Sequence, residues 1–524
     1  MWPFRRGASD GFMSCFLLSL GAIAMAYPSS IVASTLAKPS FLEYMGVGDE
    51  RGIYSSKKRL VGTITALFQA GAIPGLLCAC EISDRFGRKK ALLFISIISI
   101  IGTVGVTAAQ NMAMLLIFRF LSGAGSFAYL GLVPLYIAEL ATPRRRGLFG
   151  GLVGTFIGFG YCGASFVGLA FYFIQNKEMQ WRGPFAVGIL WPVVTLATYP
   201  FIPESPRYLL MKNRPDEALD VVSRLHADSN DDEHSFMLAE YSQMKQQADF
   251  ERTLDHSWSQ LIMKPSYRKR LILIAGIKFF GQSTAVLVLN NYGPIFYAAL
   301  GFKTRDQLIL AGGRDIVAFV GNAIGALLMD NFGRRRLLLT GYVGCLITLC
   351  VFAAMVAEEQ KQDNMGLVGV GMAALFTFLL FYAAGIDAAT WVYTAEIFPS
   401  HMRSKALAVS VSIAASTSLA YLQVTPLAVA DIGWKYFLVF ICVTVVGCVW
   451  AYFNIFETKN IPLEEISEKF GAADEVVVHL SETMADPGSR KHSINPEAQL
   501  EKGEGAPTEH IESSAKTALA RENR

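Results

Sequence analysis

The chain has 524 residues, of which 52% are hydrophobic and only 17% are charged, whereas a soluble domain usually carries about 25% charged residues. The net charge of +3 is too small to indicate a nucleic-acid partner. All eight cysteines fall inside apolar runs and show no metal-ligand spacing, so we expect packed thiols, no metal site and no cofactor.

Twelve apolar runs recur along the chain, each near the length that crosses about 30 Å of hydrocarbon as a helix. Helices are expected because lipid offers backbone groups no hydrogen-bond partner. The sequence therefore predicts an all-α, multi-pass membrane protein. The first run follows Arg5 and Arg6, but it is too long for a signal peptide and we expect it to be retained. The runs are centred near residues 22, 70, 100, 122, 160, 192, 281, 318, 346, 378, 416 and 445.

Six runs precede a polar stretch and six follow it, which predicts two bundles joined by a loop. Within the stretch, apolar residues recur at helical spacing from Asp216 to His226, as in an amphipathic helix. Beyond about residue 470 the chain is polar and acidic with few aromatics, so we expect a disordered tail. The predicted regions are an N-terminal six-helix bundle (1–202), an intracellular helical loop (203–270), a C-terminal six-helix bundle (271–455) and a cytoplasmic tail (456–524).

Basic residues gather in the short loops after the second, fourth, eighth and tenth runs. Positive loops favour the cytoplasm, so both termini and the middle loop are expected there. Lys57-Lys58-Arg59, before the second run, goes against this pattern.

One basic loop occurs twice, as Asp84-Arg85-Phe86-Gly87-Arg88-Lys89-Lys90 and as Asp330-Asn331-Phe332-Gly333-Arg334-Arg335-Arg336. Two copies at equivalent places indicate a duplicated half. Each glycine allows a tight turn between helices, and the arginines can bind helix carbonyl ends or carboxylates. In a chain this apolar, the duplication predicts a functional site where the two halves meet.

Five further segments occur in order at matching spacing. They are Pro134-x-Tyr136-Ile137-Ala138-Glu139 leading to Arg146-Gly147, Pro203-Glu204-Ser205-Pro206-Arg207, Trp391-Val392-Tyr393-x-x-Glu396-Ile397-Phe398-Pro399 leading to Arg403, Ile432-Gly433-Trp434-Lys435, and Glu457-Thr458-Lys459 with Leu463-Glu464-Glu465. With the two loops, the chain resembles the fungal-type members of the sugar porter family of the major facilitator superfamily. The resemblance runs from the first apolar run to residue 466.

The resemblance implies a monomeric twelve-helix transporter that works by alternating access at the plasma membrane. It also implies a charge network that closes the cytoplasmic side, with carboxylates and arginines of the two halves paired across the helix ends. Partly desolvated pairs of this kind hold more strongly than surface pairs, which contribute about 0–1 kcal/mol each. The residues carried over are Asp84, Arg88, Glu139, Arg146, Glu204, Arg207, Asp330, Arg334, Glu396 and Arg403.

The first run departs from the family pattern at the site of proton coupling. Members that resemble proton symporters have Gly-Tyr-Asp where this chain has Ala26-Tyr27-Pro28, while the arginine that partners the acid remains as Arg119. Proline accepts no proton, so uniport is favoured. The alternative is symport through a substitute acid, of which Asp387 is the best placed.

The solute site also departs from the family, because several of its polar positions are lost. Gln282 and Trp391 remain and offer a hydrogen-bonding amide and a flat stacking face. Lys278 lies one turn before Gln282 and Asp387 one turn before Trp391, so both charges are expected to face the interior. The two either form an ion pair, or one of them contacts the solute or carries a proton. Asn290, Asn291 and Tyr292 are candidates for the outer vestibule, and Arg314-Asp315 is read as an interfacial pair.

We therefore expect transport of a small polar solute, most simply a monosaccharide. A disaccharide, a polyol or an organic acid such as quinate stays open as an alternative. The positive charge of Lys278 makes an anionic solute more plausible than is usual for this family. A sensor that binds sugar without transporting it is a second alternative. An enzyme is not expected, because no nucleophile–base or metal constellation occurs.

Overall fold

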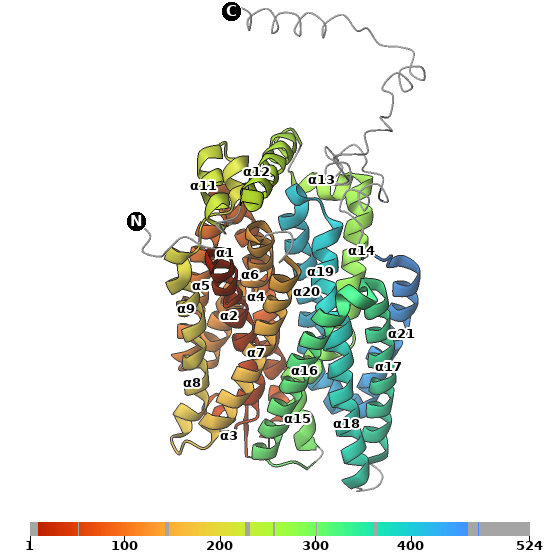
Figure 1. Ribbon diagram of the computed structural model, residues 1–524. Helices are drawn as coiled ribbons and strands as arrows, with labels where there is room; N and C mark the ends of the chain where they lie inside the picture. The colour runs from red at the N-terminus through yellow and green to blue at the C-terminus, as the bar shows by residue number, and fades with distance from the viewer. Residues whose placement is uncertain are drawn as a thin grey trace, which may run out of the picture. The chain divides into compact units, whose positions relative to one another are not determined.

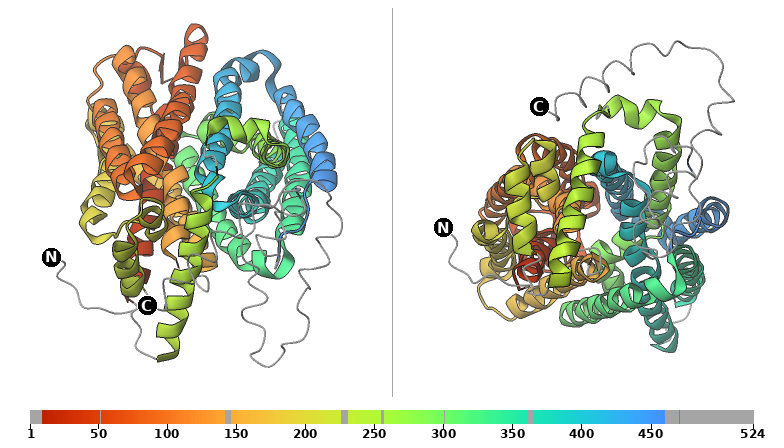
Figure 2. Two further views of the ribbon diagram at one scale, coloured as in Figure 1. Left: turned by 90° about the horizontal axis from the view of Figure 1, so that it is seen from above. Right: turned by 45° about the horizontal axis from the view of Figure 1, so that its top comes forward.

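The computed structural model describes residues 9–50, 52–141, 146–225, 231–254, 257–299, 301–359, 365–459 and 470. The predicted tail beyond residue 470 lies outside this part of the chain. In Figure 1 the helices of the first half, in red to yellow, lie beside those of the second half, in green to blue. Figure 2 shows the same separation from two further directions.

The first half comprises the helices before the polar stretch. They are α1 (Ser9–Ser19), α2 (Gly21–Leu36), α3 (Pro39–Tyr44), α4 (Lys58–Phe86), α5 (Arg88–Thr107), α6 (Met112–Leu140), α7 (Arg146–Tyr172), α8 (Lys177–Gly188) and α9 (Leu190–Thr198), with 3-10 turns η1 (Ser55–Lys57) and η2 (Tyr199–Phe201).

The second half comprises the helices after the polar stretch. They are α14 (Pro265–Gln282), α15 (Val286–Ala299), α16 (Thr304–Phe332), α17 (Arg334–Glu359), α18 (Met365–Phe381), α19 (Ala388–Ile397), α20 (Ser400–Ile432) and α21 (Tyr436–Asn454). A π-helical turn, η3 (Tyr382–Asp387), joins α18 to α19, and a 3-10 turn, η4 (Gly433–Lys435), joins α20 to α21.

Within the described residues, eleven helical segments are long and apolar enough to cross a membrane. Ten of them hold one crossing each. The eleventh, His401–Asn454, holds two, because Gly433 adopts a positive φ of 56° and the chain turns back between α20 and α21. Twelve crossings follow, and the predicted all-helical class is confirmed. A small addition is the hairpin of β1 (Gly48–Asp49) and β2 (Gly52–Ile53), paired antiparallel.

Large apolar side chains point away from the helix bundle along the crossings. Leu327 on α16 is 76% exposed, and Ile347 on α17 and Val446 on α21 are also exposed. Water disfavours apolar surface of this extent, whereas lipid accommodates it. The outer surface is therefore the one that meets the bilayer.

Small residues allow close packing inside the first half. A Cβ on Gly71 of α4 would overlap the carbonyl of Phe120 on α6, and a Cβ on Gly123 of α6 would overlap the carbonyl of Phe68 on α4. Backbones can approach this closely only through glycine, which is the usual means of packing membrane helices. The pair α4–α6 thereby forms a tight support for α20, which lies against α4 across the two halves.

The two ends of the helices differ in what covers them. The motif end carries the loops at Gly87 and Gly333 together with α10 (Pro206–Met211), α11 (Pro215–Leu225), α12 (Asp231–Glu251) and α13 (Trp258–Met263). The hairpin end carries α3 and the β1–β2 hairpin. The predicted amphipathic helix is α11, which buries Ala218, Val222 and Leu225.

Candidate functional site

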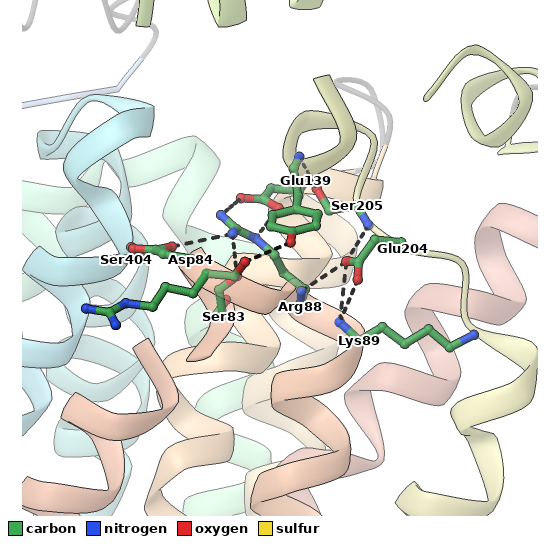
Figure 3. A network of polar contacts seen from close by, with 10 residues as sticks. Ser83, Asp84, Arg88, Lys89, Glu139, Glu204, Ser205 and Ser404 are labelled. Carbon is green, nitrogen blue, oxygen red and sulfur yellow. Dashed lines mark hydrogen bonds and ion pairs between the residues drawn. The ribbon is translucent and has the colours of Figure 1, made fainter. Parts of the chain in front are cut away.

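At the motif end, the turn between α4 and α5 is capped by Glu204. Gly87 has φ 104°, and a Cβ there would overlap a carboxylate oxygen of Glu204. Glu204 Oε1 accepts the backbone N–H groups of Arg88 at 3.0 Å and Lys89 at 3.3 Å (Figure 3). A carboxylate at this position meets the first free N–H groups and the positive end of the helix dipole. Burial nevertheless dominates these donors and raises the pKa of the Glu204 carboxyl.

The second half repeats this cap with Glu457. Gly333 has φ 87°, and Glu457 accepts the backbone N–H of Arg334 at 2.8 Å and of Arg335 at 3.2 Å. Sequence reasoning quoted the segment around Glu457 but did not assign it to the gate. The available signal was that Glu204 and Glu457 each follow the last crossing of their half.

The arginine of each loop pairs with a carboxylate of its own half. Arg88 binds Glu139 through two parallel hydrogen bonds of 2.9 Å, and Arg334 binds Glu396 at 2.9 Å. The other oxygen of Glu396 accepts the hydroxyl of Thr458 at 2.8 Å. These pairs join α5 to α6 and α17 to α19, so each of them lies within one half.

Contacts between the halves at the motif end come from other side chains. Ser404 on α20 donates to Asp84 on α4 at 2.9 Å, and Asp84 also accepts from Arg88 at 3.4 Å. Figure 3 shows Ser404 and Asp84 facing each other beside the Arg88 network. Ser404 is a residue that sequence reasoning missed, because a serine in a helical segment carries no distinctive signal.

The indole of Trp258 makes a second bridge at this end. It belongs to α13 and donates to Glu81 on α4 at 2.5 Å, while the ammonium of Lys405 on α20 lies 5.4 Å from its ring centre. A helix of the polar stretch thus contacts both halves. Neither Trp258 nor Glu81 was predicted.

For the remaining predicted gate residues, the structure gives fewer contacts. Arg403 is buried and donates to the carbonyl of Phe398 at 3.3 Å. Arg207 lies within electrostatic range of Glu139. The side chains of Arg146 and Asp330 fall outside the part that the structure describes, although α7 and α16 include their backbones.

In the membrane interior, Lys278 and Asp387 both contact Trp391, the ammonium over the ring face and the carboxylate at the indole N–H. The Lys278 ammonium lies 3.3 Å from the ring centre, a cation–π contact worth about 0.5–2 kcal/mol. Asp387 accepts the indole N–H of Trp391 at 3.1 Å and the amide of Asn322 at 3.3 Å. Among the described residues, no ion pair joins Lys278 to Asp387. One face of Trp391 is thus covered by the ammonium.

The other predicted solute residues lie around the break between α14 and α15. The amide oxygen of Gln282 accepts the hydroxyl of Ser418 at 3.2 Å. Asn291 donates to the Leu287 carbonyl of its own helix at 3.0 Å. Tyr292 contacts the hydroxyl of Thr65 on α4 at 2.6 Å and is therefore a contact between the halves near the hairpin end.

Arg119 is almost wholly buried and bonds to backbone carbonyls. It donates to the carbonyl of Pro28 at 3.0 Å and to that of Ile64 at 3.4 Å, and its guanidinium lies over the ring of Phe68. Within the described residues no carboxylate lies at ion-pair distance from Arg119. The carbonyl of Pro28 takes the place of the acid that the resemblance would put there.

Arg314 and Asp315, predicted to be an interfacial pair, are 1% and 2% exposed and therefore buried within the protein. Arg314 donates to Asp315 at 2.8 Å and to the carbonyl of Asn290 at 3.1 Å. Pro294 lacks the N–H that would otherwise meet the Asn290 carbonyl, and Arg314 supplies that donor. Asp315 accepts the hydroxyl of Ser165 on α7 at 2.5 Å, so the cluster joins α15 and α16 to the first half.

Comparison with known proteins agrees with this geometry. The family described as "Sugar (and other) transporter" matches residues 14–470. The chain is 30% identical over 475 residues to the MFS-type transporter criB of Aspergillus cristatus, covering 89% of this chain and 95% of that protein. It is 26% identical over 491 residues to the probable glucose transporter rco-3 of Neurospora crassa, covering 89% and 80%.

A solved structure of the proton:xylose symporter XylE, bound to 6-bromo-6-deoxy-D-glucose, has the same fold. The TM-score is 0.75 at 21% identity, over 88% of this chain and 99% of XylE. The chain therefore belongs to the sugar transporter family of the major facilitator superfamily, a family of membrane transporters and not of enzymes.

Proposed function

We propose that this chain carries a small polyhydroxylated solute of monosaccharide size across a membrane by alternating access. The observation that carries the proposal is that the halves are tied at both ends by a few separable polar contacts. Asp84–Ser404 lies at the motif end, and Thr65–Tyr292 lies toward the hairpin end. Breaking one set while keeping the other opens the site to one side at a time.

The proposed moving bodies are the regions 1–202 and 271–455, with 203–270 as a helical strap and 456–524 as a tail. The basic loops support a motif end that faces the cytoplasm, which would put both termini there and the protein in the plasma membrane. The protein is proposed to act as a monomer, because each half supplies its own share of the central residues.

Uniport is the proposed mode, since Arg119 has carbonyl partners where a symporter of this family would need a proton acceptor. Asp387 is the alternative carrier, since its carboxylate lies in the membrane interior and accepts from Trp391 and Asn322. The deciding experiment is uptake of labelled glucose, xylose and polyols in transport-null cells with and without a protonophore. Uptake that survives the protonophore supports uniport. Solute-driven proton entry in liposomes that vanishes in Asp387→Asn would establish symport.

Solute contact is tested by Gln282→Ala and Trp391→Ala. Each is expected to lower uptake at least tenfold at normal surface expression, because the amide and the indole are partly exposed hydrogen-bonding and stacking groups. Ser416→Ala is the matched control, since that exposed hydroxyl bonds only to the Ser412 carbonyl of its own helix. Wild-type uptake by both variants would show that the solute binds elsewhere.

A further inference from the structure

Lys278 is a buried cation without a hydrogen-bond acceptor. Its side chain on α14 is 3% exposed, and its ammonium lies on the face of Trp391. Within the described part of the chain it makes no hydrogen bond and no ion pair. An indole face balances part of the charge but accepts none of the three N–H donors in the manner of an oxygen. Buried ammonium groups are ordinarily paired, so an acceptor is missing here.

Asp387 does not supply that acceptor. Its two oxygens accept one N–H each, from Trp391 and from Asn322, while the ammonium lies over the face of the same indole. The negative charge is thus held by neutral donors, while the positive charge has no oxygen partner. Asp387 thus has a hydrogen-bond donor for each oxygen, whereas Lys278 lacks an oxygen acceptor among the described residues.

Gln282 adds a second donor on the same face of α14, one turn further along. Its amide contacts the hydroxyl of Ser418 at 3.2 Å, and that hydroxyl also donates to the carbonyl of Ala414 at 2.8 Å. Gln282, Trp391 and Asp387 each keep part of their surface exposed. One charged and one neutral donor, one helical turn apart, are donors of the kind that bind a carboxylate.

We propose that Lys278 and Gln282 bind the carboxylate of the transported solute, so that the solute is a small polyhydroxylated monocarboxylate, a sugar acid. The inference rests on the proposed transport function and names its substrate class. A neutral hydroxyl would leave the ammonium uncompensated, whereas a carboxylate compensates it. Asp387 keeps lone pairs for solute hydroxyls, and it would repel a second carboxylate.

The experiment uses the full chain in proteoliposomes and three probes of similar size: D-gluconate, D-glucose and the dicarboxylate D-glucarate. Gluconate is expected to have a KM at least tenfold below that of glucose, and glucarate is expected to be excluded. Lys278→Met should raise the gluconate KM at least tenfold and change the glucose KM less than twofold. Lys278→Arg should retain the preference for gluconate. Lys269→Met is the matched control, an exposed lysine on the same helix.

Two outcomes separate this inference from the proposed function. Glucose transport without any preference for gluconate, or equal effects of Lys278→Met on both solutes, overturns the inference and leaves transport intact. If none of the solutes moves, the proposed function fails, and binding then decides the inference separately. Gluconate should raise the melting temperature of the purified wild type and of Lys278→Arg but not of Lys278→Met. No shift in the wild type overturns the inference.

Discussion

The two halves of this protein are alike at the motif end and different in the membrane interior. At the motif end, each half has a glycine with positive φ, a glutamate that caps the next helix, and an arginine paired with a carboxylate. The spacing of about 250 residues separates two copies of one arrangement. Helix ends need the same capping in both halves, so both copies retain it.

In the interior the halves diverge. The first half holds Arg119 on backbone carbonyls, whereas the second holds the Arg314–Asp315 pair, Lys278 and Asp387. Interior charges are costly and persist where they bind or position something. We therefore expect the repeated motif end to close the transporter. We expect the interior residues that differ between the halves to determine which solute is bound and whether its transport is coupled to protons.

The largest expected effect tests the interior difference. Asp315→Ala leaves the Arg314 guanidinium buried without its counterion and should lower the free energy of unfolding by about 3–5 kcal/mol. Arg119→Met should cost clearly less, because no carboxylate among the described residues pairs with Arg119. Urea or thermal unfolding of the purified protein measures both, and the double variant Arg314→Met/Asp315→Leu should regain most of the loss. Equal costs for Asp315→Ala and Arg119→Met would contradict the comparison.

A second effect tests the likeness of the motif end. Gly87→Ala and Gly333→Ala each force a side chain into a left-handed backbone and against a capping glutamate, so each should cost about 1–3 kcal/mol of stability. Gly369→Ala is the control, because a Cβ at that position meets no atom within 4 Å. If only one of the two loops were sensitive, the two caps would not be equivalent.

A smaller effect tests whether the Asp84–Ser404 contact between the halves helps to close the motif end. Ser404→Ala removes the hydrogen bond to Asp84 and should favour opening of the motif end by about 1 kcal/mol, roughly fivefold. The readout is thiol labelling of a cysteine at Ala408, with Ser416→Ala as the control on the same helix. Unchanged labelling would remove Asp84–Ser404 from the set of closing contacts.

The smallest effect concerns pH at the first cap. Burial raises the folded pKa of Glu204 above its unfolded value, so its contribution to stability is present at low pH and is lost as pH rises through the folded pKa. Glu204→Gln removes this titration and should give a flatter profile of melting temperature against pH from about 4 to 7. A variant profile that parallels the wild type would show that Glu204 does not titrate there.

The crossings and the repeated loops were predictable because both are local. Run length against bilayer thickness sets the number of helices, and a glycine between apolar runs marks a turn wherever the chain goes next. Spacing along a helix also placed Asp387 beside Trp391, and these two side chains are hydrogen bonded. The amphipathic helix α11 follows from the same kind of local pattern.

Partners distant in the chain could not be predicted in this way. Ser404 meets Asp84 across 320 residues, and Trp258 meets Glu81 across 177. Spacing shows which side chains share a helix face, but not which helix that face will meet. The axial rotation of each helix depends on its neighbours, as the approach of α4 to α6 shows.

By itself, the sequence determined a duplicated, twelve-crossing membrane protein with a tight basic turn in each half, because hydrophobic length and backbone geometry act within short segments. Only the tertiary structure decided that Lys278 lies on Trp391 and not against Asp387, and that Arg314 and Asp315 are buried. Those outcomes depend on the break between α14 and α15 and on how the helices pack around it. Helix packing determines which side chains lie near a buried charge, and therefore which partner that charge has.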